Sequence, residues 1–406
     1  MSASGDRFLP YGKQKITDED VAAVTRALRS QYLTTGPEVA AFEAEFATAV
    51  GARFAVACSS GTAGLHLAAL ALGLGPDDSV IVPSQTFVAT ANAARYVGAE
   101  VVFADVSPAT GLLLHENLEA AFTRAAGHRK PVAVFPVHLN GQSVDMPAIA
   151  DFARRNGLRV VEDACHAIGG AIDLQSGNSS LIGDCRYSDM AVFSLHPVKT
   201  ITMGEGGVVT TNDSELHRRL LLFRNHGLSR DESAFEHRKL AVDQDGVTNP
   251  WYYELHALGF NYRASDVNCA LGRSQLRKLK EFVAARRALR DRYVEALTPL
   301  QQWVTPLETV PYCRPAWHLN VVLIDFEGLG VSRAKVMRRL ADRGVGSQVH
   351  YIPVHLQPYY RQRYGTQQLP GAERYYERCL SLPLYPEMET GDVRRAVRAL
   401  ENSLKP

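Results

Sequence analysis

The sequence has few cysteines and almost no excess of charge of either sign. Its six cysteines, in 406 residues, are scattered without a Cys-x-x-Cys pair, so neither a disulfide framework nor a metal site of the zinc type is indicated. Lys and Arg number 44 and Asp and Glu 43, which gives a formal net charge of +1. Without a positive excess, general binding to nucleic acids or to anionic membranes lacks its driving field.

Long apolar runs are also missing. No uninterrupted apolar stretch approaches the roughly 20 residues that a membrane-spanning helix needs. Residues 1–7 lack the charged-then-apolar order of a signal peptide. We therefore expect a cytoplasmic protein with reduced thiols. With 46% hydrophobic and 21% charged residues, the composition is that of an ordinary globular protein.

Short apolar segments alternate with helical patterns through the first two thirds of the chain. This alternation predicts an α/β fold with a largely parallel sheet covered by helices. Expected strands are 54–58, 80–82, 100–104, 132–137, 159–163, 190–193 and 208–211, with helices opening at Gly61 and over 87–97.

The pattern changes after Arg263, where longer helical stretches begin. Further on, strands are expected at 317–324 and 347–350 and a helix at 335–343. We therefore predict a large domain, residues 1–270, and a smaller C-terminal α+β domain, residues 271–406. The polar, turn-rich residues 229–250 are interpreted as a surface loop.

Two residues at the ends of apolar segments carry the main chemical signal. Lys199 closes the segment Phe193-Ser194-Leu195-His196-Pro197-Val198-Lys199, where a lysine most often extends into water. A lysine whose pKa is lowered by burial can instead attack an aldehyde and form a Schiff base. Asp163 ends the segment 160–163 and either caps the next helix or holds a protonated ring nitrogen. Together they indicate pyridoxal phosphate (PLP), bound covalently to Lys199.

A serine and glycine cluster precedes the first expected helix. Ser60, Gly61 and Thr62 place hydroxyls and backbone N–H groups at a helix N-terminus, which suits the phosphate of PLP. Ser194 can add a further hydroxyl. Phe87 either stacks on the pyridine ring or packs in the core. His166 either orients Asp163, contacts the ring hydroxyl, or is an ordinary core histidine.

The order of the motifs resembles the DegT/DnrJ-type sugar aminotransferases. The resemblance covers nearly the whole chain, from Tyr11 to the C-terminal helix. The matching motifs are S-G-T-A at 60–63, T-F-V-A-T-A-N at 86–92, P-V-H-L-N-G-Q at 136–142, V-E-D-A-C-H-A at 161–167, F-S-L-H-P-V-K at 193–199, G-E-G-G-V-V-T-T-N-D at 204–213, R-N-H-G at 224–227 and G-F-N-Y-R at 259–263.

The resemblance implies the aspartate-aminotransferase fold (PLP fold type I) and a homodimer with shared active sites. It implies that Lys199 is the Schiff-base lysine, that Asp163 pairs with the pyridinium nitrogen, and that Asn261 reaches the phosphate in the partner subunit. Substrate contacts are expected from Tyr11, Gln31, Tyr32, Leu33, Thr34, Gly61, Ser194, Asn261, His350 and Tyr351. Asn140 departs from the pattern, since relatives have a smaller residue after the P-V-H-L motif.

Several segments are similar to the branch of this family that serves pseudaminic acid biosynthesis. They include H-P-V-K at 196–199, W-Y-Y-E at 251–254 and V-H-Y-I-P-V-H-L-Q-P-Y-Y at 349–360. This similarity implies transfer of an amino group from L-glutamate, which becomes 2-oxoglutarate, to C4 of a UDP-linked 4-keto-6-deoxy amino sugar.

Three alternatives stay open. The chain can aminate a GDP- or dTDP-linked keto sugar at C4 or C3, or bind a nucleotide sugar without turnover. The dehydratase branch of the family replaces the lysine by histidine, and Lys199 argues against it.

Overall fold

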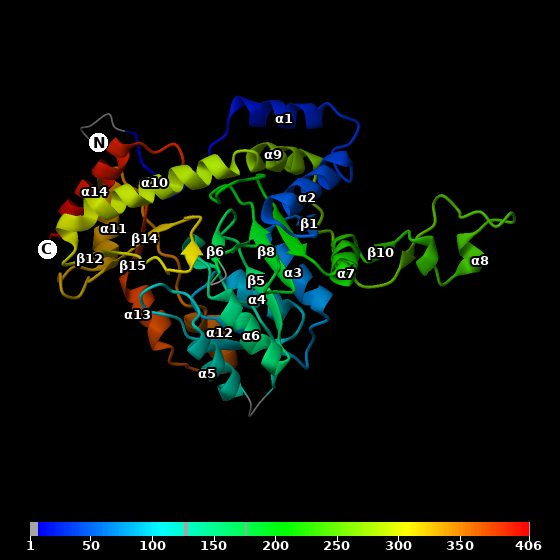
Figure 1. The fold of residues 1–406 in the computed structure, drawn as a ribbon, viewed down its shortest axis with the longest axis horizontal. Helices are drawn as coiled ribbons and strands as arrows, with labels where there is room; N and C mark the ends of the chain where they lie inside the picture. The colour runs from blue at the N-terminus through cyan, green and yellow to red at the C-terminus, as the bar shows by residue number, and fades with distance from the viewer. Residues whose placement is uncertain (1–6, 126–128, 175–176, 406) are drawn as a thin grey trace.

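The computed structural model describes residues 7–125, 129–174 and 177–405. A seven-stranded sheet, in the order β1-β9-β8-β5-β4-β2-β3, forms the centre of the larger part (Figure 1). Neighbours from β8 to β3 run parallel, whereas β9 is antiparallel to both β1 and β8. The strands are β1 (Phe54–Cys58), β2 (Ser79–Pro83), β3 (Glu100–Ala104), β4 (Pro131–Val134), β5 (Arg159–Asp163), β8 (Met190–Ser194) and β9 (Gly207–Thr211).

Helices cover this sheet, which explains why its strands are apolar on both faces. Helices α2 to α7 each contact the sheet, and α9 packs on α1 and α2. The predicted sheet is confirmed, although β4 is shorter than the predicted strand 132–137. The helices are α1 (Asp18–Leu28), α2 (Pro37–Val50), α3 (Gly61–Leu72), α4 (Val88–Tyr96), α5 (His115–Ala125), α6 (Met146–Asn156), α7 (Ser214–Arg224) and α9 (Asp266–Leu276).

The 19-residue helix α10 (Leu279–Leu297) leads from α9 to a smaller antiparallel sheet, β12-β14-β15 (Figure 1). Helices α10, α11 and α14 pack together beside it. The remaining elements of this part are β12 (Val304–Pro306), β14 (Asn320–Ile324), α11 (Arg333–Asp342), α12 (Pro358–Tyr364), α13 (Pro370–Arg378), β15 (Cys379–Leu382) and α14 (Thr390–Leu404). A third small sheet joins β13 (Cys313–Arg314), β6 (Ala171–Asp173) and β7 (Ser179–Leu181).

Two predicted strands differ from the structure. The strand at 317–324 begins only at Asn320, because the amides of Ala316 and His318 are bonded to Gly141 and Asn140 instead of a strand. The strand at 347–350 is wrong: only one bridge, Gln348 to Ser381, forms there. The adjoining amide of Gly346 is bonded to Leu9, so the segment is shared between two neighbours and forms no ladder.

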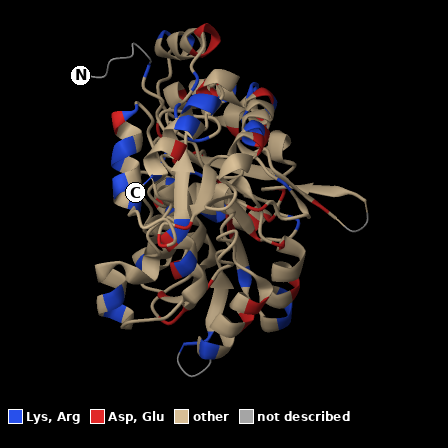
Figure 2. Cartoon of the chain, turned by 90° about the vertical axis from the view of Figure 1, so that its left-hand side faces the viewer, with Lys and Arg blue, Asp and Glu red and all other residues tan. Residues whose placement is uncertain are grey.

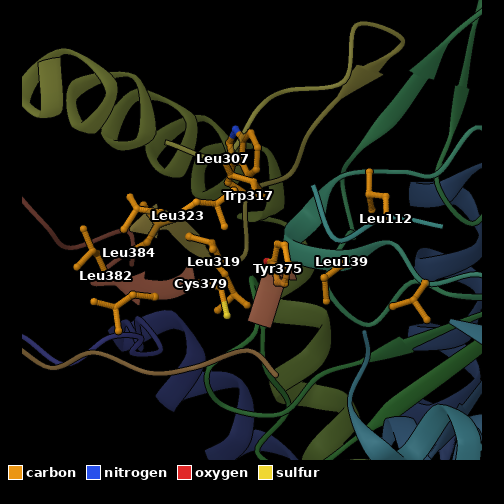
Figure 3. Close-up of a cluster of buried hydrophobic side chains, with 14 of the residues drawn as sticks. Leu112, Leu139, Leu307, Trp317, Leu319, Leu323, Tyr375, Cys379, Leu382 and Leu384 are labelled. Atoms are coloured by element: carbon orange, nitrogen blue, oxygen red, sulfur yellow. The ribbon is translucent and has the colours of Figure 1, made fainter. Parts of the chain in front are cut away.

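The hydrophobic core runs without a break from the large sheet to the small one (Figure 3). One buried cluster joins Leu112 and Leu139 of the large part to Trp317, Leu323 and Tyr375 of the C-terminal part. Helices of residues 358–378 also pack back on the large sheet: Tyr360 meets Phe103 of β3 edge to face, with ring centroids 5.2 Å apart. Because this core is shared by both parts, packing alone does not separate two domains, and the boundary at residue 270 stays a prediction.

Residues 228–258, here called the arm, project far from the body of the molecule (Figure 1). The predicted loop at 229–250 is not without structure, because the arm contains β10 (Leu228–Ser229), β11 (Glu254–Leu255) and the short helix α8 (Arg238–Ala241). Buried Glu254 holds it together by accepting hydrogen bonds from the amides of Glu236 and His237 and from the Tyr252 hydroxyl.

Charged residues of both signs are spread over the surface helices (Figure 2). Within residues 7–125, 129–174 and 177–405, every helix is too short or too polar to cross a membrane.

Candidate active site

A cavity of about 540 Å³ opens where the C-terminal ends of β5 and β8 meet the N-terminus of α3. This edge of an open α/β sheet is where ligands generally bind. Most of the predicted site residues line it. They are Tyr11, Ser60, Gly61, Thr62, Phe87, Asp163, His166, Ser194, Lys199, His350 and Tyr351.

Lys199 is half-buried in the wall of this cavity, on the loop that follows β8. Burial lowers the pKa of its amine, while the charge of Asp163 acts in the opposite direction. The free base is therefore more accessible here than for a lysine in water. That is the form of the amine that reacts with an aldehyde.

Asp163 is the last residue of β5 and is buried. Its Oδ2 accepts a hydrogen bond from Thr90 Oγ1 at 2.7 Å, and its Oδ1 accepts one from the amide of Cys165 at 3.2 Å. Two bonds to neutral donors hold the carboxylate in one orientation beside the cavity. Thr90 was missed from the sequence, although it lies within the motif at 86–92.

The N-terminus of α3 forms a tight anion cradle. Ser60 caps the helix by accepting from the amide of Ala63, while the amides of Gly61 and Thr62 have no acceptor within the helix. Gly61 allows close approach, since a Cβ there would lie 2.8 Å from the Cβ of Ser194. The cradle fits a phosphate group, which helix N-termini commonly bind.

An aromatic and histidine cluster forms the other wall. Phe87 and Tyr351 lie with ring centroids 5.7 Å apart, and Tyr11 and His350 with centroids 5.4 Å apart. His350 Nδ1 is 2.7 Å from the hydroxyl of Ser381, and burial lowers the pKa of His350 to about 3. Its ring is therefore neutral at ordinary pH.

His166 has clear partners. Its Nδ1 accepts from the amide of Asn140 at 3.3 Å, so its Nε2 carries the proton and donates to the Tyr351 hydroxyl at 3.0 Å. Burial lowers the pKa of His166 well below its usual value. Of the interpretations left open, direct orientation of Asp163 lacks support, because among the described residues the His166 ring forms its hydrogen bonds with Asn140 and Tyr351.

Five predicted residues lie away from the cavity of their own chain. Gln31, Tyr32, Leu33 and Thr34 are exposed on the segment between α1 and α2, and Asn261 is exposed at the root of the arm. Thr34 pairs with Ser265 through an isolated bridge, which brings the two segments together.

His318 was not singled out from the sequence, although its ring lines the cavity 4.6 Å from that of His166. The only signal was its place in a predicted strand, and residue type alone does not reveal such a position. Size does not identify the site either. A groove of about 1220 Å³ lies beside β3 and α12, but the described residues lining it include no lysine, aspartate or histidine.

Comparison with known proteins agrees with this geometry. Residues 14–401 match the DegT/DnrJ/EryC1/StrS aminotransferase family. The chain is 38% identical over its full length, and over 99% of the relative, to the spore coat polysaccharide biosynthesis protein SpsC of Bacillus subtilis.

Solved structures give the same result. Helicobacter pylori PseC, an aminotransferase of pseudaminic acid biosynthesis, superposes with a TM-score of 0.86 at 26% identity, covering 98% of this chain and 99% of PseC. S. venezuelae DesV, solved in complex with a ketimine intermediate, gives a TM-score of 0.84 at 32% identity, covering 99% of this chain and 100% of DesV. The predicted PLP fold type I is therefore confirmed.

The cofactor of these enzymes is PLP. The residues of the cavity fit it, since they combine a half-buried lysine, a fixed carboxylate and an anion cradle that a single Cβ at Gly61 would fill. The chain belongs to the DegT/DnrJ/EryC1/StrS aminotransferase family and is a PLP-dependent sugar aminotransferase.

Proposed function

We propose that the protein transfers the amino group of L-glutamate to C4 of UDP-2-acetamido-2,6-dideoxy-β-L-arabino-hexos-4-ulose. The product is UDP-4-amino-4,6-dideoxy-N-acetyl-β-L-altrosamine, a precursor of pseudaminic acid. The single observation that supports this most is the superposition with PseC over 98% of the chain. The segments 251–254 and 349–360 support it further, the second because His350 and Tyr351 line the cavity.

Bound PLP supplies an electron sink and carries the amino group from donor to acceptor. In this proposal the amides of Gly61 and Thr62 and the hydroxyl of Ser194 hold its phosphate, while Asp163 keeps a proton on its ring nitrogen. Lys199 Nζ removes the α-proton of glutamate and delivers a proton to C4 of the sugar in the second half-reaction.

The other residues of the cavity orient the reactants. Phe87 faces the cofactor ring, and Tyr11, His350 and Tyr351 lie on the sugar side. The hydrogen bond from His166 to Tyr351, at 3.0 Å, fixes the position of the tyrosine hydroxyl.

We also propose a cytoplasmic homodimer in which each chain completes the site of the other. Asn261 and residues 31–34 are exposed and do not line their own cavity. A groove of about 920 Å³ lies between α2, α7 and the root of the arm and has Arg263 and Thr35 in its wall. The six cysteines are all free, as suits a reducing compartment.

A second candidate is favoured by a different observation. Identity to SpsC, a spore coat polysaccharide protein, is 38%, against 26% to PseC. Sequence identity follows substrate choice more closely than backbone superposition does, because a fold hosts many substrates. This candidate is a C4 or C3 aminotransferase for another nucleotide-linked keto sugar, with GDP or dTDP in place of UDP.

Substrate assays separate the two candidates. The enzyme is incubated with glutamate and with UDP-, GDP- or dTDP-linked 4-keto-6-deoxy sugars made by the matching dehydratases, and products are identified by mass spectrometry and NMR. The first proposal expects the altrosamine product from the UDP sugar alone. Turnover of only the GDP or dTDP sugar contradicts it and supports the second candidate.

A further inference from the structure

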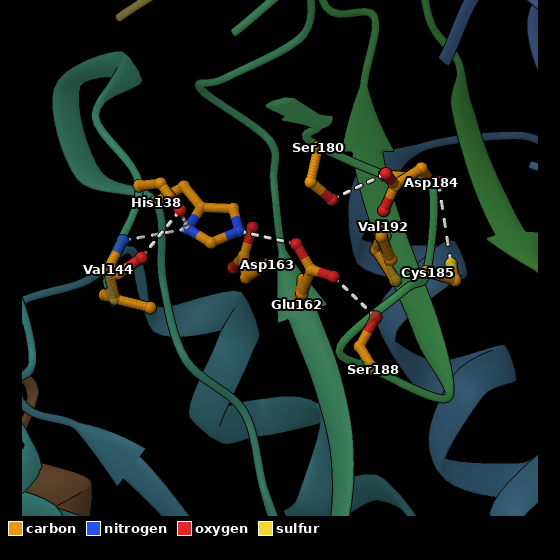
Figure 4. A network of polar contacts seen from close by, with 12 residues as sticks. His138, Val144, Glu162, Asp163, Ser180, Asp184, Cys185, Ser188 and Val192 are labelled. Carbon is orange, nitrogen blue, oxygen red and sulfur yellow. Dashed lines mark hydrogen bonds and ion pairs between the residues drawn. The ribbon is translucent and has the colours of Figure 1, made fainter. Parts of the chain in front are cut away.

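A buried polar network lies on the face of β5 opposite to Asp163. Glu162 precedes Asp163 in the strand, so the two side chains point to opposite sides of the sheet. Glu162 Oε2 is 2.7 Å from His138 Nε2, and its other oxygen accepts a hydrogen bond from the Ser188 hydroxyl (Figure 4). Glu162 is 4% exposed and His138 is fully buried.

The hydrogen bonds define the charge of this network. The amide of Val144 donates to His138 Nδ1 at 3.3 Å, so this nitrogen carries no proton. The single ring proton is then on Nε2 and is donated to Glu162. A neutral imidazole and a neutral hydroxyl therefore hold an ionised carboxylate, and the network has a net negative charge.

The same network also fixes the backbone of Asp163. The amide of His138 donates to the carbonyl oxygen of Asp163 at 3.0 Å, and the amide of Asp163 donates to that of Pro136 at 2.8 Å. His138 thus holds both the carboxylate of Glu162 and the main chain of Asp163. A shift of either residue is transmitted to the other.

Neither of these two neighbouring buried carboxylates forms an ion pair with a lysine or arginine among the described residues, although the charge of Asp163 acts on Lys199. Among the ion pairs of the described residues, Glu162 has only His138 and Asp163 has none. Like charges in a medium of low dielectric repel each other unless a positive charge is placed close by. A protonated group in contact with Asp163 relieves this repulsion.

We propose that Glu162, held by His138 and Ser188, is a positioning residue for Asp163 whose negative charge also favours a proton on the ring nitrogen of PLP. The inference rests on the proposed contact between Asp163 and that nitrogen. It does not depend on which sugar is aminated.

The test compares two ligands that differ only in the ring nitrogen. Apoenzyme is titrated with PLP and with its deaza analogue, in which carbon replaces this nitrogen, and binding is followed by absorbance and protein fluorescence. Asp163→Asn is expected to remove most of the preference for PLP. Glu162→Gln is expected to lower the preference for PLP about five- to tenfold, because it removes one buried negative charge that attracts the proton on the ring nitrogen.

A matched control substitution exists at Asp189, which directly precedes β8 and contacts the start of β5. Asp189 accepts from the amide of Val160, near the start of β5, and pairs with Arg159. Asp189→Asn makes the same acid-to-amide change about 10 Å along the strand from Asp163. The preference of the Asp189→Asn variant for PLP over the deaza analogue is expected to stay within twofold of wild type.

The outcomes distinguish the role of Glu162 from the contact between Asp163 and the ring nitrogen. If Asp163→Asn loses the preference and Glu162→Gln keeps it, the role of Glu162 is overturned. If Asp163→Asn keeps the preference, the contact with the ring nitrogen is itself wrong. Folding of Glu162→Gln is checked by circular dichroism, since its amide can accept from His138 and donate to Ser188. If it does not fold, the double variant His138→Leu/Glu162→Met, which removes both partners, is expected to give the same loss.

Discussion

At the scale of single residues, the site depends on one amine whose environment differs from water. Lys199 is half-buried beside Asp163, and burial lowers the pKa of its amine. Lys199→Ala is expected to lower turnover by at least the ~10²–10⁴-fold typical of a lost acid–base group, and to remove the absorbance band of the Schiff base between Lys199 and the cofactor. Spectra and steady-state rates check this. Lys15→Ala, which removes a surface ion pair with Glu281, is the control and is expected to keep both.

His350 gives a prediction about stability. Burial lowers its pKa to about 3, whereas in the unfolded chain it titrates near 6.5. Below pH 6.5 the unfolded state takes up a proton that the folded state does not, so folding stability falls as pH drops from 6.5 toward 3. Between pH 6.5 and 5 this residue is expected to cost the apoenzyme about 2 kcal/mol. Urea unfolding of wild type and His350→Gln at several pH values measures this loss. If the free energy of unfolding falls equally with pH in both proteins, the prediction is contradicted.

The sequence predicts some residues of the site and misses others. Lys199, Asp163 and Gly61 were predicted because residue type and position after a strand both point to a cofactor. Thr90 and His318 were not, because threonine and histidine are common in helices and strands. Only the packing of α4 on β2 and β3 brings Thr90 to the carboxylate of Asp163.

At the scale of elements, the start of α3 combines capping with close packing. A Cβ on Gly61 would lie 2.8 Å from Ser194 and 3.2 Å from the sulfur of Cys165, so neighbours must shift. Gly61→Ala is expected to cost about 1–3 kcal/mol of stability, as overpacking does, and to weaken PLP binding. Gly75→Ala, with nothing within 4 Å, is the control. Thermal unfolding and PLP titration measure both effects. If Gly61→Ala and Gly75→Ala have the same stability and the same affinity for PLP, the role of Gly61 in the anion cradle is contradicted.

At the scale of the whole molecule, the large sheet was predictable, including its edge strands β1 and β3, whereas the chain pairing around the small C-terminal sheet was not. Buried strands such as β2 and β8 are largely apolar runs, so the sequence pattern identifies them. Residues 347–350, Ser-Gln-Val-His, contain a single apolar residue, and the backbone here is shared between Leu9 and Ser381 and gives only a bridge. Such pairing depends on chain segments far apart, which local patterns do not contain.

The arm presents apolar side chains that a single chain leaves in water. Leu258 is 85% and Trp251 70% exposed. Exposed apolar groups gathered on one element typically mark an interface. Leu258→Asp is expected to shift the proposed dimer toward monomer in sedimentation velocity. Val294→Asp, at a half-exposed position on α10, is the control and is expected to leave the dimer intact. If Leu258→Asp stays a dimer, the arm is not part of the interface.

Shared active sites predict complementation between two inactive variants. Lys199→Ala lacks the amine of its own cavity, whereas Asn261→Asp places a negative charge where the proposed dimer sends Asn261 to the partner's phosphate. Asn261 is exposed and away from its own cavity, so this substitution is expected to leave the fold intact. In a mixed dimer one site combines Lys199 from one chain with Asn261 from the other. Activity is therefore expected to return when the two inactive variants are unfolded and refolded together, and to stay absent when each is refolded alone. If the mixture stays inactive although mixed dimers form, each chain builds its site alone, and Asn261 has no role across the interface.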